Sequence, residues 1–128
     1  CTGEAERALD LALDYARGRS QFGKVLYSFQ DVSFAMAEAA TRIKAARLLW
    51  KDALQRIDRG RPFTMESSMA KLFAAQTLMD TASLALDLMG YRAIGERTLI
   101  ERIHMGARLM KSIDGTPAVQ KMVIASQL

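Results

Sequence analysis

Apolar residues recur at helical spacing along most of the chain, and this pattern predicts an all-α protein. The first helix is expected over residues 4–16, where alanines and leucines repeat on one face. Gly18 and Gly23 interrupt the pattern over residues 18–27, which separates this helix from the next. Ser28 has the side chain of an N-cap, and a long amphipathic helix is expected to follow it to about Arg59.

Three more helices are expected in the second half of the chain. Thr64 can cap a helix that continues to Gly90; because this helix is apolar on more than one face, we expect it to lie centrally or at a subunit interface. A shorter helix is expected over residues 96–111, and Thr116-Pro117 can start a last helix that runs to the end. These lengths and short connections predict an antiparallel up-down four-helix bundle with short extra C-terminal helices.

Composition narrows the class of protein without identifying it. The 128 residues suffice for one domain, and 50% apolar with 25% charged residues is typical of a soluble globular protein. A single cysteine, Cys1, excludes an internal disulfide, and no segment is apolar for long enough to predict a membrane span. The net charge is +4, but no aromatic residues alternate with the basic ones as a stacking surface for bases would need. We therefore expect no nucleic-acid partner. The start at Cys1 suggests a fragment or a processed product.

Candidate chemistry is sparse along the chain. Glu101 and His104 form an E-x-x-H pair, but a di-iron bundle needs that pair on two helices, and the sequence has 1 histidine. We therefore predict no metal site. Asp114 stands just before the last helix, where unpaired N–H groups attract anions or polar cofactor atoms. An ordinary Asp-Gly turn before a capped helix explains the same residues.

Several motifs in a fixed order carry a resemblance to a known family. They are YARGRSQFGK at 15–24, FQ at 29–30, AARLL at 45–49, MAKLF at 69–73, GT at 115–116 and QK at 120–121. In order and spacing the chain resembles the C-terminal helical domain of acyl-CoA dehydrogenases over essentially all 128 residues. The resemblance implies that residues 1–128 are this one domain, without the N-terminal helical domain and the middle β-domain that precede it in the family.

The same resemblance implies an activity. Members of the family bind FAD noncovalently between the middle and helical domains, and a neighbouring subunit supplies part of the site. A carboxylate removes the α-proton of an acyl-CoA thioester while the β-hydrogen leaves as hydride to the flavin, and electrons pass to electron-transfer flavoprotein. The implied protein is an oxidoreductase of fatty acid metabolism that acts on CH–CH bonds. It would form a dimer or tetramer in the cytoplasm, or in the mitochondrial matrix of a eukaryote, and this chain alone would be inactive.

Carried over position by position, the resemblance assigns roles to individual residues. Asp114 falls at the position of the catalytic base, and Thr116 would contact the flavin. Arg19 would pair with the FAD pyrophosphate of the neighbouring subunit, because a guanidinium meets phosphate oxygens bidentately. Phe22 would pack near the adenine, and we expect Asp114 to face a groove that it shares with Arg19. The remaining cofactor positions are Gln30, Asp87 and Gly90.

Departures from the family pattern leave alternatives open. Asp114 stands where the family usually has Glu, which draws the carboxylate back by roughly 1–1.5 Å. Asp87 replaces a usual Gln, and a carboxylate near a pyrophosphate is repulsive unless a cation such as Arg92 intervenes. Tyr91 stands in a turn that is glycine-rich in the family, and residues 105–106 replace an Arg-Asp pair.

Two other functions therefore stay open: a non-catalytic relative kept for subunit association, and a free-standing helical binding module. Each of two candidate residues also has an alternative structural role. Arg19 could be a cation at a helix C-terminus, and Phe22 could be an aromatic residue of the core.

Overall fold

A computed structural model describes residues 1–94 and 98–128, and over these ranges the chain is almost entirely helical. The helices are α1 (Thr2–Gly18), α2 (Gln30–Asp58), α3 (Thr64–Met89), α4 (Tyr91–Ile94), α5 (Leu99–Met110) and α6 (Pro117–Ala125). A two-stranded antiparallel hairpin, β1 (Ser20–Gln21) and β2 (Lys24–Val25), and a 3-10 turn, η1 (Leu26–Ser28), join α1 to α2. The glycines predicted a break at this place but not the hairpin.

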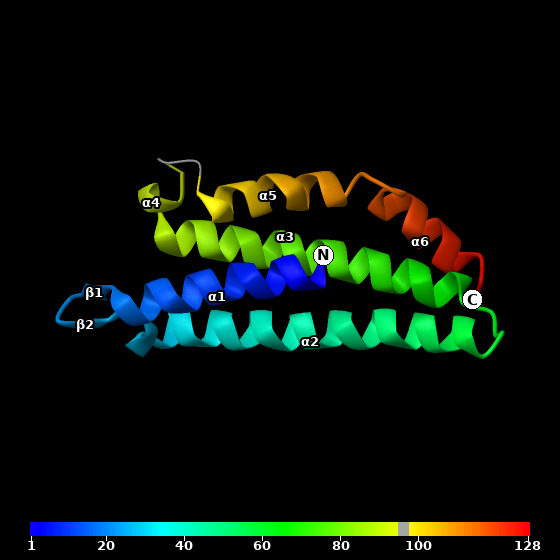
Figure 1. Ribbon diagram of the computed structural model, residues 1–128, viewed down its shortest axis with the longest axis horizontal. Coiled ribbons are helices and arrows are strands. Elements are labelled where there is room, and N and C mark those ends of the chain that lie inside the picture. Colours follow the sequence, from blue (N-terminus) through cyan, green and yellow to red (C-terminus); the bar gives the residue numbers. More distant parts are fainter. Residues whose placement is uncertain (95–97) are drawn as a thin grey trace.

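The predicted antiparallel bundle is confirmed, with α3 as its central helix. α1 and α2 pack along one side of α3, and α5 and α6 follow one another along the other side (Figure 1). The helices α1, α2, α3 and α5 alternate in direction, and α4 and α6 are the short extra helices (Figure 1). None of the helices in the described ranges has the length and apolarity needed to cross a membrane.

The core is built mainly from alanine. In α1, Ala5, Ala8, Ala12 and Ala16 are at most 1% exposed, and α3 contributes further buried alanines. Side chains this small let helix axes approach closely, so α3 can bury several faces against different neighbours at once. The expectation that this helix lies centrally is thus confirmed, and its fully buried Leu78 is among the largest side chains of the core.

Two predicted helix caps are wrong. Ser28 lies in η1, and the N-cap position of α2 is occupied by Phe29. Thr64 lies inside α3, which is preceded by Phe63. Neither phenylalanine can supply a capping oxygen, so these two helix starts depend on packing rather than on a side-chain cap.

The caps nearer the C-terminus follow the sequence signals. Thr116 accepts a hydrogen bond from the Val119 N–H at 3.4 Å, and Pro117 is the first residue of α6, as predicted. The helix ends at Ala125, three residues before the predicted end. α5 begins at Leu99 and ends at Met110, whereas its predicted start at residue 96 lies outside the described residues.

Replacement of Leu78 by alanine tests the central position of α3. The variant loses apolar contacts on a side chain that is 0% exposed, so the free energy of unfolding should fall by about 2–5 kcal/mol. The matched control is Leu48→Ala on α2, where the side chain is 56% exposed, and it should change stability by less than about 0.5 kcal/mol. Urea denaturation followed by circular dichroism measures both, and equal losses would contradict this description of the core.

Candidate functional site

The turn between α5 and α6 holds Asp114 in an uncommon backbone conformation. Its φ is 57°, and that of the following Gly115 is 100°. A left-handed φ is uncommon for a residue other than glycine, and such a conformation persists only where surrounding contacts impose it. The Asp114 side chain is exposed, so its carboxylate is available to a partner or ligand outside the described chain.

Two side chains from neighbouring helices supply those contacts. Lys71 of α3 donates from Nζ to the carbonyl oxygens of Met110 at 2.7 Å and Gly115 at 3.2 Å. Gln120 of α6 donates from Nε2 to the carbonyl oxygen of Asp114 at 2.9 Å. The backbone on both sides of the Asp114 side chain is therefore tied to the bundle.

A second set of polar contacts ties the end of α5 to α2 across α3. Lys111 donates to Gln76 Oε1 at 2.9 Å, and Gln76 donates in turn to Asp80 Oδ1 at 2.6 Å. Arg42 of α2 donates to the other carboxylate oxygen of Asp80 at 2.8 Å. Because Arg42 and Asp80 are partly exposed, their ion pair contributes little to stability, but the set of contacts links the C-cap residue of α5 to α2.

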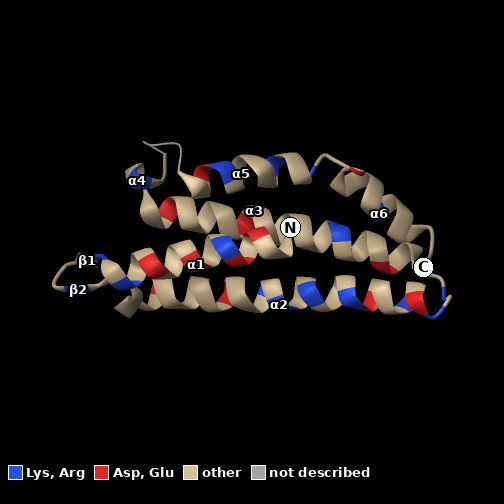
Figure 2. Ribbon diagram, in the orientation of Figure 1, with Lys and Arg blue, Asp and Glu red and all other residues tan. Residues whose placement is uncertain are grey.

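Other candidate residues lie on the hairpin that joins α1 to α2. Phe22 has a φ of 54° and is 92% exposed, which rules out a role in the core of this chain. Arg19 is exposed and forms no ion pair with any described carboxylate, although Arg17 and Lys24 each lie over an aromatic ring. Figure 2 shows the basic residues that gather at the end of α1 and on the hairpin.

Three further candidate positions lie at the same end of the bundle as the hairpin (Figure 1). Gln30 begins α2, Asp87 lies in the last turn of α3, and Gly90 follows that helix with a φ of 58°. All three are exposed, as is Tyr91, so this end presents a polar surface with aromatic side chains.

The structure does not bring Asp114 and Arg19 together. The turn that carries Asp114 contacts Lys71, which lies sixteen residues, or about 24 Å of helix, before Asp87 on α3. The hairpin lies at the far end of the molecule from this turn (Figure 1). The prediction that one chain holds both side chains in a shared groove is therefore wrong, and the chain has two separate candidate sites.

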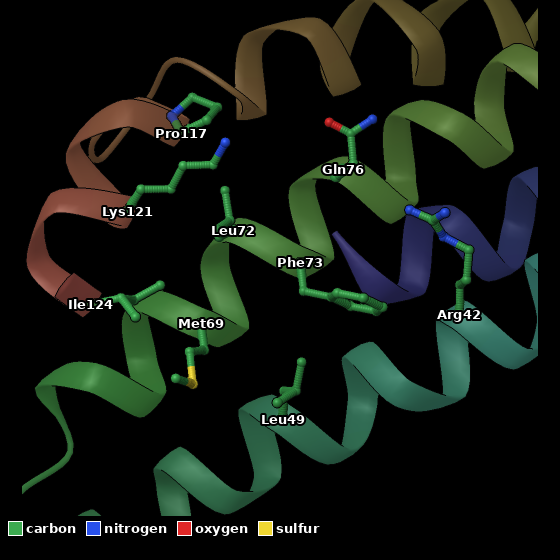
Figure 3. Close-up of a pocket in the computed structure, with 9 residues that line it drawn as sticks. All are labelled: Arg42, Leu49, Met69, Leu72, Phe73, Gln76, Pro117, Lys121 and Ile124. Carbon is green, nitrogen blue, oxygen red and sulfur yellow. The ribbon is translucent and has the colours of Figure 1, made fainter. Parts of the chain in front are cut away.

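A third feature is a groove of about 480 Å³ between α2, α3 and α6, which the sequence did not predict. Figure 3 shows side chains of α6 facing those of α3 across it. Its lining is mostly apolar, with cationic side chains from α2 and α6. The lining residues are Arg42, Leu49, Met69, Leu72, Phe73, Gln76, Pro117, Lys121 and Ile124.

Metal chemistry finds no support in the described ranges. They contain no group of three or more His, Cys, Asp or Glu side chains placed to hold an ion. The E-x-x-H pair at Glu101 and His104 therefore lacks the further ligands that a metal site in a helical bundle needs.

Comparison with known proteins identifies the family. The family model for the acyl-CoA dehydrogenase C-terminal domain matches residues 1–128. The probable acyl-CoA dehydrogenase YngJ of Bacillus subtilis is 38% identical over 98% of this chain and 33% of its own length. The caffeyl-CoA reductase-Etf complex subunit CarC of Acetobacterium woodii is 36% identical over the same shares, 98% and 33%.

Solved structures agree with this assignment. Butyryl-CoA dehydrogenase from Megasphaera elsdenii superposes with a TM-score of 0.94 at 34% identity, over 98% of this chain and 33% of that protein. An FAD complex of PigA gives the same TM-score of 0.94 at 27% identity, again over 98% and 33%. The chain belongs to the acyl-CoA dehydrogenase family and corresponds to its C-terminal helical domain. It spans about a third of the length of these relatives.

Lys71 and Gln120 are the site residues to which sequence reasoning gave no role. Both lie in motifs that carry the family resemblance, MAKLF at 69–73 and QK at 120–121. Their hydrogen bonds to backbone carbonyls at the turn become visible only in the folded chain.

Replacement of Gly115 by alanine tests how tightly the turn is built. An added Cβ would lie 2.6 Å from Gln120 Nε2, and the φ of 100° is unfavourable for any L side chain. We expect the free energy of unfolding to fall by about 1–3 kcal/mol. Gly106→Ala is the matched control, since nothing lies within 4 Å of its Cβ position in α5, and it should be stabilising by about 0.5–1 kcal/mol. Thermal denaturation of both variants checks the difference in sign.

Proposed function

We propose that this chain is the FAD-binding and oligomerisation domain of a longer acyl-CoA dehydrogenase-like flavoprotein, which dehydrogenates an acyl-CoA thioester between its α and β carbons. The proposal rests on the family match together with the braced turn that presents the Asp114 carboxylate. On this proposal the N-terminal helical and middle β-domains of the family would precede the chain and complete both sites.

The surface at the hairpin fits the phosphate and adenine ends of FAD. Arg19 is exposed and unpaired among the described residues, and a planar guanidinium is suited to a pyrophosphate. Phe22 is held outward in a strained conformation, where its ring can stack on a base. Gln30 and the backbone at Gly90 add polar contacts from the same end, and the nucleotide would belong to a neighbouring subunit.

At the other site, the Asp114 carboxylate would accept the α-proton of the thioester. The N-terminus of α6 follows three residues after Asp114. Thr116, at the N-cap of the same helix, would hold the flavin edge near the reacting carbons. When bound, FAD supplies the acceptor for the hydride that leaves the β-carbon.

The distance between the two sites supports self-association as a dimer or tetramer. Arg19 and Asp114 lie in separate parts of the bundle, so on this proposal each cofactor would need a carboxylate from one subunit and a guanidinium from the next (Figure 1). The apolar groove between α2, α3 and α6, and exposed apolar side chains such as Leu48 and Met122, offer surface for such contacts.

Relatives support a proposal for the further partner and the compartment. The name of CarC places that relative in a complex with an Etf, which supports electron-transfer flavoprotein as the acceptor of electrons here. A mouse relative, 35% identical over 98% of this chain and 31% of its own length, is a mitochondrial short-chain acyl-CoA dehydrogenase. We propose the cytoplasm of a bacterium or the mitochondrial matrix of a eukaryote as the compartment, and the mitochondrial relative supports the second of these.

Asp114→Asn in the longer flavoprotein tests the catalytic assignment. The amide keeps the shape of the side chain but cannot take up the α-proton, so anaerobic bleaching of the flavin by acyl-CoA should slow by about 10²–10⁴-fold. The bound flavin should stay at the level of the unaltered protein. The control Asp10→Asn changes an exposed carboxylate on α1 and should bleach at the normal rate. If the Asp114→Asn variant bleaches at the normal rate, Asp114 is not the base.

A non-catalytic subunit is the second candidate function, and Asp87 favours it. Its carboxylate is exposed at the end where Arg19 and Phe22 would meet the nucleotide, and there it would repel a pyrophosphate. A longer protein that stays colourless after incubation with FAD, yet associates normally, would decide for this alternative.

A further inference from the structure

We propose that Lys71 and Gln120 are positioning residues that fix the direction of the Asp114 carboxylate by holding the three backbone carbonyls around it. The proposal deepens the proposed function and rests on it.

Lys71 closes the loop that carries Asp114. Its ammonium binds the carbonyl of Met110, the last residue of α5, and that of Gly115, one residue beyond Asp114. A single cation therefore joins the two ends of the connecting segment. Carbonyls at a helix C-terminus carry partial negative charge, so a partly buried ammonium is well placed there.

Gln120 holds the middle of the same segment. Its side chain is 8% exposed and donates to the carbonyl of Asp114 itself, one turn into α6. The approach is possible because Gly115 has no Cβ, which would otherwise meet the amide nitrogen at 2.6 Å. Since the carbonyls of residues 114 and 115 are both held, the peptide unit after Asp114 cannot rotate freely.

The neighbouring cation does not duplicate this role. Lys111 lies at the end of α5, but its ammonium donates to Gln76 rather than to the turn. Without Lys71, two carbonyls would lose their charged donor, and the uncommon φ of 57° at Asp114 would lose the contacts that impose it. A displacement of about 1 Å at a reacting group can slow catalysis by about 10²-fold.

Lys71→Met and Gln120→Met test the proposal, because methionine is unbranched, close in length to both side chains and without a donor. Lys44→Met is the matched control, since Lys44 is exposed on α2. The first readout is amide hydrogen exchange in this chain at Ser112 and Ile113, whose N–H groups bond to the Leu109 carbonyl. We expect exchange there to quicken by at least about tenfold in both variants, with exchange in α1 and α2 unchanged.

The second readout is the flavin reduction rate in the longer protein. Both variants should lower the limiting rate by about 10–100-fold and leave the concentration of acyl-CoA for half-maximal reduction within about twofold. Normal exchange at the turn in both variants would overturn the proposal. So would exchange that quickens equally in every helix, because the side chains would then only stabilise the fold.

The two proposals fail in different ways. If Asp114→Asn bleaches normally while Lys71→Met still loosens the turn, the catalytic function falls and the positioning of the turn stands. If Asp114→Asn is inactive while Lys71→Met and Gln120→Met keep the normal reduction rate, the catalytic function stands and the positioning role falls.

Discussion

Close packing of small side chains along α3 determines how the other helices are arranged. Because alanines on this helix let its neighbours approach on several sides, α1, α2, α5 and α6 all pack against the same element. Polar side chains on α3 can then act at fixed places along it. Lys71 reaches the turn before α6, whereas Asp87 lies in the last turn of α3, at the end with the hairpin.

The separation of the two candidate sites along α3 determines how the proposed function would work. Lys71, which holds the turn at Asp114, lies about 24 Å of helix before Asp87, so on the proposed function Arg19 and Asp114 of one chain would meet different flavins. Self-association is therefore not an addition to the proposed chemistry but a condition for it. A second subunit would bring its own Arg19 to the site at which the first subunit supplies Asp114.

The sequence predicted the parts of this arrangement that follow from local patterns. Helical spacing gave the bundle, and the Thr116-Pro117 pair gave the start of α6. The predicted caps at Ser28 and Thr64 were wrong, because phenylalanines occupy the N-cap positions of both helices and packing holds the helix starts. The hydrogen bonds that hold the Asp114 turn could not be predicted from local patterns, since the partners of Lys71 lie 39 and 44 residues further along the chain.

The roles of Arg19 and Phe22 were predicted from family motifs, and the exposure of Phe22 excluded its alternative as a core residue.

Subunit complementation tests whether Arg19 and Asp114 of one chain serve two different flavins. Arg19→Glu and Asp114→Asn variants of the longer flavoprotein would each be inactive alone, then mixed after dissociation and allowed to reassociate. In a mixed pair, one site receives both intact residues and the other receives neither. Random reassociation should therefore restore about a quarter of the normal bleaching activity. A mixture that associates but stays inactive would contradict the claim, because it would mean that both residues must lie on the same chain.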